Sequence, residues 1–280
     1  MTAAAERARP RPEQLPLYPA KAWLPAPIYW LYRAWRTLAT GLCFAGFWGG
    51  AVVFGWLWLR ILALWPGTRV EKMRRCQRSM RRGFRLFHFV MRVLRLYRRV
   101  SPVASLRPGR TPVVLVANHP TLCDVTSIAS LFPDVVAVAR PSFAKNPLLG
   151  QLVRRCGFVP LGMHVLKECE ERLRLGFDVL VFPEGTRSPR GGGALQPFHR
   201  GAFELAARAQ VPIVLLKLTC APPALSKGLP IWKISDRMAL LTIEPFATLE
   251  PSQLSADSRA TCRAIEQRYR EVLGYDGDLP

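Results

Sequence analysis

Two patterns of hydrophobic positions divide this chain of 280 residues. An uninterrupted apolar run occupies residues 37–59, whereas residues 101–280 alternate short apolar, often β-branched runs with stretches of helical periodicity. This alternation predicts an α/β domain with a mostly parallel sheet flanked by helices, because strands buried on both faces are apolar throughout. The apolar runs fall at residues 113–118, 135–139, 158–161, 179–183 and 211–218, with a further strand at 239–246 and a closing helix at 256–272.

The apolar run at residues 37–59 predicts a membrane segment. Its 23 residues carry no charge, and about 20 apolar residues in a helix suffice to cross the hydrocarbon core of a bilayer. The run begins too late and is too long for a cleaved signal peptide. Its glycines leave two arrangements open, a single packed span or a hairpin that enters and leaves one leaflet. We therefore expect a basic N-terminal segment at 1–36 and a transmembrane or re-entrant segment at 37–66.

A basic amphipathic helix is predicted next, within residues 67–100. Thr68 and Glu71 have the spacing of a capping box, and residues 69–99 hold 12 Lys or Arg and one Glu, mixed with apolar side chains. The formal charge of +21 belongs mainly to residues 1–99, whose net charge is +16. Such helices bind anionic lipid with about 1 kcal/mol per cation. Nucleic acid is the competing partner, but the adjoining apolar run favours lipid and places the following residues on the cytoplasmic side.

The seven cysteines never occur at C-x-x-C spacing. They favour neither a zinc site nor a disulfide framework, so reduced thiols facing the cytoplasm are expected. Cys123 lies between a histidine and an aspartate and could be considered a nucleophile, but a small buried cysteine is the commoner role. No metal or other cofactor is expected.

The segment VVLVANHPTLCD places polar groups directly after an apolar strand. In an α/β sheet, ligands bind beyond the carboxyl ends of the strands. Asp124 would lie near the start of the next helix, where its carboxylate can accept a hydrogen bond from the imidazole of His119. A histidine held in this way keeps one ring nitrogen free to take a proton from a hydroxyl. Since no G-x-S-x-G segment supplies a serine nucleophile, the substrate itself is expected to provide the attacking hydroxyl.

A second polar segment, FPEGTRS at residues 182–188, also follows an apolar strand. We expect it at the same edge of the sheet as His119. Gly185 permits a close backbone approach, and the guanidinium of Arg187 is a planar fork suited to phosphate. The alternative is a surface loop in which Glu184 and Arg187 form an ordinary ion pair. Two polar loops at the ends of two apolar strands favour a site.

These motifs resemble those of the glycerolipid acyltransferase family, which includes the 1-acylglycerol-3-phosphate acyltransferases. NHPTLCD is similar to its Asn-His-x4-Asp motif and FPEGTRS to its Phe-Pro-Glu-Gly-Thr-Arg-Ser motif, while PFHRGAFELA and VPIV resemble its later segments. The resemblance implies that His119 is the general base, that Asp124 orients it, and that an acceptor hydroxyl attacks the thioester of an acyl-CoA or acyl carrier protein. It also implies a set of substrate-binding residues: Asn118, Glu184, Gly185, Thr186 and Arg187.

One stretch departs from the pattern of that family. Many lysophosphatidate-type members have a Gly-aromatic stretch ending in arginine, whereas this chain reads GFVPLGMH and has no arginine before His164. The acceptor is therefore a lysophosphatidate-like lipid, another lysolipid, an aminolipid or a hydroxylated lipid. Arg140 is a candidate for a second phosphate contact, while His164 and His199 are expected to be structural.

We interpret the chain as a membrane-bound O-acyltransferase of phospholipid or related lipid synthesis, with its α/β domain at residues 101–280. Its expected partners are membrane lipid, the acyl donor and a lysolipid acceptor, not nucleic acid. The alternative is a lipid-binding or lipid-transfer protein that retains the fold without catalysis.

Overall fold

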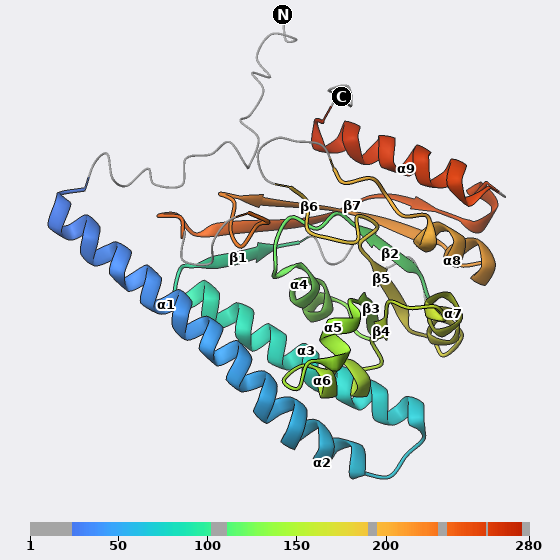
Figure 1. Ribbon diagram of the computed structural model, residues 1–280, viewed down its shortest axis with the longest axis horizontal. Coiled ribbons are helices and arrows are strands. Elements are labelled where there is room, and N and C mark those ends of the chain that lie inside the picture. Colours follow the sequence, from blue (N-terminus) through green and yellow to red (C-terminus); the bar gives the residue numbers. More distant parts are fainter. Residues whose placement is uncertain (1–23, 102–110, 190–194, 229–233, 256, 276–280) are drawn as a thin grey trace, which may run out of the picture.

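A seven-stranded sheet forms the centre of the protein (Figure 1). The computed structural model describes residues 24–101, 111–189, 195–228, 234–255 and 257–275, so most of the predicted basic segment at 1–36 lies outside the described residues. The strand order is β1-β7-β6-β2-β5-β3-β4, and every neighbouring pair is parallel except β6 and β7. The prediction of a mostly parallel sheet is thus confirmed. The strands are β1 (Tyr97–Val100), β2 (Val114–Ala117), β3 (Val135–Ala139), β4 (Val159–Pro160), β5 (Asp178–Val181), β6 (Ile213–Ala221) and β7 (Ala239–Leu249).

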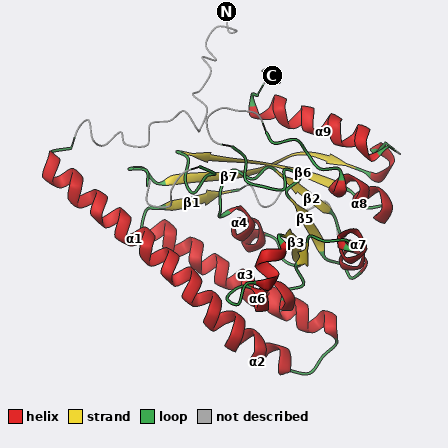
Figure 2. Ribbon diagram, viewed as in Figure 1, coloured by secondary structure: helices red, strands yellow, loops and turns green. Residues whose placement is uncertain are grey.

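Helices cover both faces of this sheet (Figure 2). α4 and α3 lie on one face with α1 outside them, and α9 covers the opposite face (Figure 1). The α/β fold expected from the sequence is therefore confirmed. The helices are α1 (Ala26–Val52), α2 (Leu59–Leu64), α3 (Arg69–Val93), α4 (Asp124–Leu131), α5 (Pro141–Lys145), α6 (Gly150–Arg155), α7 (Val165–Arg174), α8 (Gly201–Ala209) and α9 (Ser258–Leu273), with a π-helical turn η3 (Val53–Trp58) and a 3-10 turn η5 (Pro251–Gln253).

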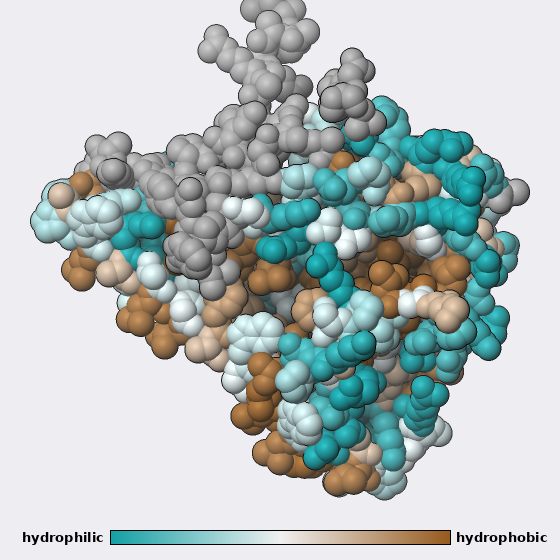
Figure 3. Space-filling model, in the orientation of Figure 1, coloured by the Kyte–Doolittle hydropathy of each residue, from teal (hydrophilic) through white to brown (hydrophobic). Residues whose placement is uncertain are grey.

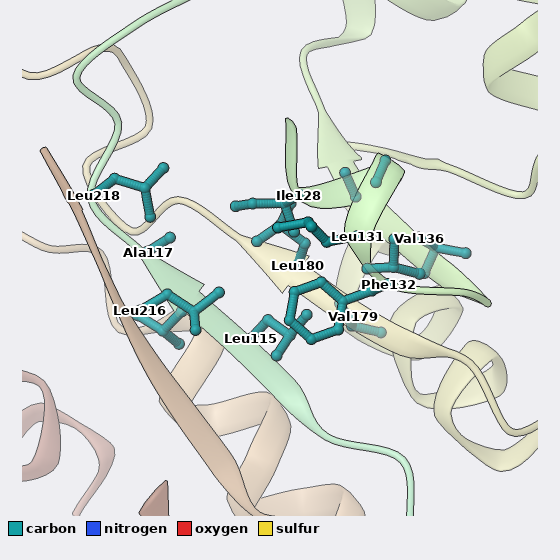
Figure 4. Packing of buried hydrophobic residues seen from close by; sticks show 14 of the residues in the cluster. Leu115, Ala117, Ile128, Leu131, Phe132, Val136, Val179, Leu180, Leu216 and Leu218 are labelled. Atoms are coloured by element: carbon teal, nitrogen blue, oxygen red, sulfur yellow. The ribbon is translucent and has the colours of Figure 1, made fainter. Parts of the chain in front are cut away.

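The buried strand β2 places the two predicted motifs at one edge of the sheet. All four of its residues are buried, and β2 pairs in parallel with β5 so that Val116 lies opposite Val181. Figure 4 shows Leu115 of β2 packed near Phe132, which follows α4, and Leu180 of β5. Each leucine buried in this way stabilises the fold by about 1.5–3 kcal/mol. Because the two strands end side by side, the segments that follow them begin side by side.

The N-terminal helix is longer than the apolar run that predicted it. α1, η3 and α2 follow one another from Ala26 to Leu64, and this is the one described helix that is long and apolar enough to cross a membrane by length and composition. One side of this helix forms hydrogen bonds with the α/β domain. Arg36 is only 2% exposed and donates hydrogen bonds to the carbonyl oxygens of Ser235, Arg95 and Arg237 at 2.7, 2.9 and 3.1 Å. The helix is therefore docked along the domain and does not stand apart from it.

The basic helix α3 begins as predicted and ends earlier. The hydroxyl of Thr68 accepts from the backbone N–H of Glu71, and the Glu71 carboxylate accepts from the backbone N–H of Thr68 at 2.7 Å, which confirms the capping box. The predicted helix through residue 99 is wrong at its end, because the chain turns at Arg95, whose φ is 55°. Residues 97–100 form β1, an edge strand parallel to β7.

Several arginines of α3 are used inside the protein. Arg74 donates to the carbonyl oxygen of Leu175 at 3.1 Å, and Arg81 donates to that of Leu131 at 2.9 Å. These guanidinium groups satisfy backbone carbonyls at helix ends, where a cation is electrostatically favourable. Only part of the positive charge of α3 is therefore available to anionic lipid.

Candidate active site

The predicted histidine and aspartate form a hydrogen-bonded pair. His119 follows β2, and Asp124 is the first residue of α4. Nδ1 of His119 lies 2.7 Å from Oδ2 of Asp124, whose side chain is fully buried, while the His119 side chain keeps 17% of its surface exposed. The amino end of a helix stabilises a carboxylate. The chain thus brings together the two side chains that the five-residue spacing suggested.

The hydrogen bonds of Asp124 determine the protonation of the histidine ring. Besides His119, the carboxylate accepts from the backbone N–H of Thr121 at 2.8 Å and from the Thr121 hydroxyl at 2.5 Å. An ionised carboxylate only accepts hydrogen bonds, so Nδ1 of His119 carries the proton and donates it. In the neutral imidazole, Nε2 is then unprotonated and its lone pair is available. This tautomer is the one that a general base requires.

The buried carboxylate of Glu184 links the two motif loops through hydrogen bonds. Its Oε1 accepts from the backbone N–H of His119 at 3.1 Å and from the hydroxyl of Ser188 at 2.6 Å, and its Oε2 accepts from the backbone N–H of Gln196 at 3.2 Å. The backbone N–H of Ser188 donates to the carbonyl of His119 at 2.8 Å. Burial raises the pKa of Glu184 and outweighs these hydrogen bonds, which lower it. Both carboxylate oxygens thus accept hydrogen bonds from the protein, and these bonds hold the two motif loops together.

Three contributors to the site lie in the quoted motifs but were not predicted as site residues. Thr121 holds the carboxylate of Asp124, and Ser188 ties the second loop to the first. The ring of Phe182 stacks on the imidazole of His119, with centroids 4.2 Å apart and planes 24° apart. This stacking fixes the plane of the imidazole. An aromatic residue directly before a polar loop was the signal available in the sequence.

The remaining predicted residues have different surroundings. The amide of Asn118 exchanges two hydrogen bonds of 2.8 Å with the backbone of Leu218, so it ties the end of β2 to β6. Gly185 is exposed with a φ of 63°, a conformation that favours glycine. Thr186 is half-buried beside it. Nη1 of the half-buried Arg187 donates to the carbonyl oxygen of Leu225 at 2.8 Å.

Other basic side chains gather at the Gly185 turn. Nη2 of the exposed Arg140 donates to the carbonyl of Gly185 at 3.3 Å, and a Cβ placed on Gly185 would lie 3.2 Å from the ring of His199. His199 therefore lies next to the second motif loop, which its sequence context did not indicate. His164 is exposed at the position before α7. Arg140 and His199 thus lie at the exposed backbone of this turn, which Arg187 follows by two residues in the chain.

An apolar cavity reaches the turn that carries the histidine and the aspartate. The cavity is partly open to solvent, and its walls include Phe44 and Phe47 of α1, Met91 of α3, and Leu122 with Cys123. Leu122 and Cys123 lie between His119 and Asp124 in the chain. A narrow apolar space beside a base is suited to a hydrocarbon chain attached to a reacting group.

The thiol of Cys123 is not placed for nucleophilic chemistry. Cys123 is buried, and desolvation together with the nearby carboxylate of Asp124 raises the pKa of its thiol well above the ordinary value. Thiolates are the reactive form of cysteine. Within the described ranges, no cluster of three His, Cys, Asp or Glu side chains could hold a metal ion.

Comparison with known proteins finds an acyltransferase domain in this chain. The family model described as Acyltransferase matches residues 98–216, a range that includes both motifs. The chain is 33% identical over 126 residues to the chloroplastic 1-acyl-sn-glycerol-3-phosphate acyltransferase BAT2 of Brassica napus, covering 42% of this chain and 36% of that protein. It is 31% identical over 139 residues to the 1-acyl-sn-glycerol-3-phosphate acyltransferase of Saccharomyces cerevisiae, covering 46% of each. The chain thus spans less than half the length of either relative.

The fold also has a solved counterpart. The crystal structure of the 1-acyl-sn-glycerophosphate (LPA) acyltransferase PlsC from Thermotoga maritima matches with a TM-score of 0.65 and 19% identity, over 87% of this chain and 97% of that one. At this identity the likeness concerns the fold. The family model and the curated relatives show that residues 98–216 carry an acyltransferase domain, similar to that of the 1-acyl-sn-glycerol-3-phosphate acyltransferases.

Proposed function

We propose that the protein is a membrane-bound O-acyltransferase that moves an acyl chain from a thioester donor to the free hydroxyl of a lysophosphatidate-like acceptor. The observation that carries this proposal is the His119–Asp124 pair, in which Asp124 binds Nδ1 of a partly exposed His119 and leaves Nε2 without this partner. The curated relatives carry the name 1-acyl-sn-glycerol-3-phosphate acyltransferase, which supports the choice of acceptor.

The geometry supports direct transfer between the two substrates. Nε2 of His119 takes the proton of the acceptor hydroxyl while the hydroxyl oxygen forms a bond to the thioester carbonyl carbon. The resulting tetrahedral species then breaks its carbon–sulfur bond, and the leaving thiolate takes the proton back from Nε2. Asp124 stays ionised and stabilises the imidazolium between the two steps. The products are the acylated lipid and a free thiol, and His119 returns to its starting state.

The acceptor phosphate is placed at the Gly185 turn. The guanidinium of Arg187 uses one of its five N–H groups on Leu225, and Arg140 reaches the same turn through the carbonyl of Gly185. Two guanidinium forks at one loop suit a phosphate monoester. The GFVPLGMH stretch contributes β4 and the turn before α7 without an arginine, so the headgroup is selected mainly at Gly185.

The acyl chain of the donor, from acyl-CoA or acyl carrier protein, occupies the apolar cavity. Leu122 and Cys123 at the cavity wall adjoin His119 and Asp124 in the chain. A hydrocarbon chain there is shielded from water while its thioester lies near the base.

The test of this function uses purified protein in lipid vesicles, a thioester labelled in its acyl chain, and separate lysolipid acceptors. We expect labelled product with lysophosphatidate and little with lysolipids whose phosphate is esterified, because a phosphate monoester presents more charge to Arg187. Binding of these lipids without turnover of any would instead favour a lipid-binding protein that retains the fold.

Replacing Arg187 with alanine should raise the KM for lysophosphatidate by about tenfold or more, since one charge-assisted phosphate contact contributes about 1.5–3 kcal/mol. Steady-state kinetics at varied acceptor concentration measure this. Arg187→Lys keeps the positive charge but lacks the planar fork, so its KM for lysophosphatidate should lie between those of wild type and Arg187→Ala. Arg174, which is exposed on α7, is the matched control: Arg174→Ala should leave the KM unchanged. An unchanged KM in Arg187→Ala would remove Arg187 from the phosphate site.

The protein is held on the membrane by a surface made by α1, α2 and α3, with its α/β domain on the cytoplasmic face. Figure 3 shows apolar side chains along the edge of the molecule that α1 follows in Figure 1. The helix of 39 residues is about 58 Å long at 1.5 Å per residue, well over a bilayer core of about 30 Å. Since Arg36 also fastens it to the domain, the helix lies in one leaflet. The exposed apolar residues of this α1–α3 surface include Trp30, Leu31, Trp35, Leu38, Leu42, Val53, Leu57, Ile61, Leu64, Leu86, Phe89, Val90 and Val93.

The double variant Leu57→Glu with Phe89→Glu should bind vesicles at least about 100-fold more weakly than wild type, because each apolar side chain withdrawn from lipid loses about 2 kcal/mol. Flotation of the protein with vesicles containing anionic lipid measures the bound fraction. Val272→Glu is the matched control, since Val272 is also exposed but lies on α9, on the other side of the sheet. Equal flotation of the double variant and wild type would contradict membrane binding through this surface.

A further inference from the structure

A buried histidine outside the site contacts the helix that carries Asp124. His88 lies on α3, is buried, and directs Nε2 toward Oγ1 of Thr126 at 3.2 Å and Oγ of Ser127 at 3.4 Å, both on α4. Burial, reinforced by the charge of Arg99, lowers the pKa of His88 to about 3. The ring is therefore neutral at physiological pH and has one N–H to donate.

The direction of this hydrogen bond follows from the neighbouring hydroxyl. Thr126 donates its own hydroxyl proton to the carbonyl oxygen of Cys123 at 2.9 Å. Its oxygen must then accept from His88, which places the imidazole proton on Nε2. Nδ1 of His88 has no hydrogen-bond partner within the described part of the chain. All the hydrogen bonding of this ring is thus directed at α4.

This chain of hydrogen bonds ends one residue from the catalytic carboxylate. The carbonyl of Cys123 accepts from the Thr126 hydroxyl and also from the backbone N–H of Ser127 at 2.8 Å, so it closes the first turn of α4. Asp124 is the next residue. Resting on the proposed acyltransferase function, we propose that His88 is a positioning residue: by fixing Thr126 it sets the first turn of α4 and hence the carboxylate that orients His119.

The other end of α4 is held by the same helix. Arg81 of α3 donates to the carbonyl oxygens of Ser130 and Leu131 at 3.2 and 2.9 Å. A cation at this end of a helix is electrostatically favourable. α3 therefore fixes α4 at both ends, with His88 near its first turn and Arg81 at its last carbonyls.

A small rotation of α4 would lower the rate of the chemical step, because it would displace the carboxylate of Asp124. Misplacement of a catalytic group by about 1 Å can cost about 100-fold in rate. His88 itself is buried and is not among the residues that line the cavity, so the affinity for the acceptor is not expected to depend on it. Loss of its hydrogen bond should thus appear in kcat and leave the KM for acceptor unchanged.

The test compares two substitutions at His88. His88→Leu removes the donor and should lower kcat by about tenfold to 100-fold, with the KM for lysophosphatidate unchanged. His88→Gln supplies an amide N–H to Thr126 and should restore most of kcat. The matched control is Gln77→Leu, because Gln77 is also buried on α3 and donates to a backbone carbonyl, that of Cys156 at 2.8 Å, away from α4. That variant should keep wild-type kcat at temperatures where it is folded.

Amide hydrogen exchange of residues 121–128, followed by mass spectrometry, gives a readout that needs no activity. Exchange there should be faster in His88→Leu than in wild type, Gln77→Leu or His88→Gln. Unchanged kcat and unchanged exchange in folded His88→Leu would overturn the proposal, as would equal losses of kcat in His88→Leu and Gln77→Leu. If wild type transfers no acyl chain, the proposed function fails, and the exchange measurement still decides whether His88 fixes α4.

Discussion

Replacing His119 with alanine is expected to lower kcat for acyl transfer by about 100-fold to 10,000-fold, which is the range that a general base contributes. The reason is that Nε2 of His119 is the acceptor for the hydroxyl proton, and the substrate hydroxyl is a poor nucleophile without it. The substitution leaves Asp124 with its two hydrogen bonds from Thr121. Folding should therefore be largely preserved, and the loss should lie in kcat.

Two comparisons make this result specific to the base. His164→Ala removes an exposed imidazole at the start of α7 and should retain wild-type kcat. Thermal melting of His119→Ala should stay close to that of wild type, so that inactivity is not explained by unfolding. Wild-type kcat in folded His119→Ala would contradict the proposed mechanism, whatever the identity of the acceptor.

Asp124→Asn should lower kcat by a similar factor through a different cause. The buried carboxylate accepts three hydrogen bonds, and an amide cannot accept on its nitrogen. If the amide nitrogen faces His119, the imidazole must turn its lone pair toward it and carry its proton on Nε2. A base in this tautomer cannot take a proton, an effect worth about 10,000-fold in a serine-protease triad.

The same substitution should also reduce stability. Oδ2 accepts from both His119 and the backbone N–H of Thr121, so an amide nitrogen in its place puts a buried donor against the Thr121 N–H, which costs about 1–3 kcal/mol. We therefore expect lower kcat with an unchanged KM for acceptor, together with a lower melting temperature. Asp134→Asn is the matched control, since Asp134 is half-buried in the turn before β3 and its φ of 55° is tolerated by asparagine. Kinetics of Asp124→Asn equal to those of Asp134→Asn would refute a role for the carboxylate.

The features that could be predicted from the sequence are those encoded over short distances. An apolar strand followed by a polar turn and a helix start brings His119 and Asp124 together within six residues, and the structure has their hydrogen bond. The capping box of α3 and the strand-and-helix alternation are equally local. Parallel neighbours then place the second motif at the same edge without further information.

The features that could not be predicted depend on contacts between distant segments. Asn118 was expected to hold substrate, but its amide bonds to Leu218, 100 residues away, because β6 lies beside β2. Glu184 was expected at the substrate, and its carboxylate instead accepts from the backbone of His119. The edge strand β1 has the sequence YRRV, which contains no apolar run from which a strand could be predicted. The surroundings of Asn118, of Glu184 and of β1 all depend on the order of the strands in the sheet. No local sequence pattern predicts this order.

In the proposed mechanism the acceptor hydroxyl attacks the thioester directly, with His119 as the base. One reaction tests it: the protein is incubated with a thioester labelled in its acyl chain, first without and then with lysophosphatidate. Intact-protein mass spectrometry and lipid chromatography follow the label. We expect no label on the protein at either stage and labelled diacyl product only after the acceptor is added. An acyl group bound covalently to the protein before the acceptor is added, and transferred from it afterwards, would contradict direct transfer.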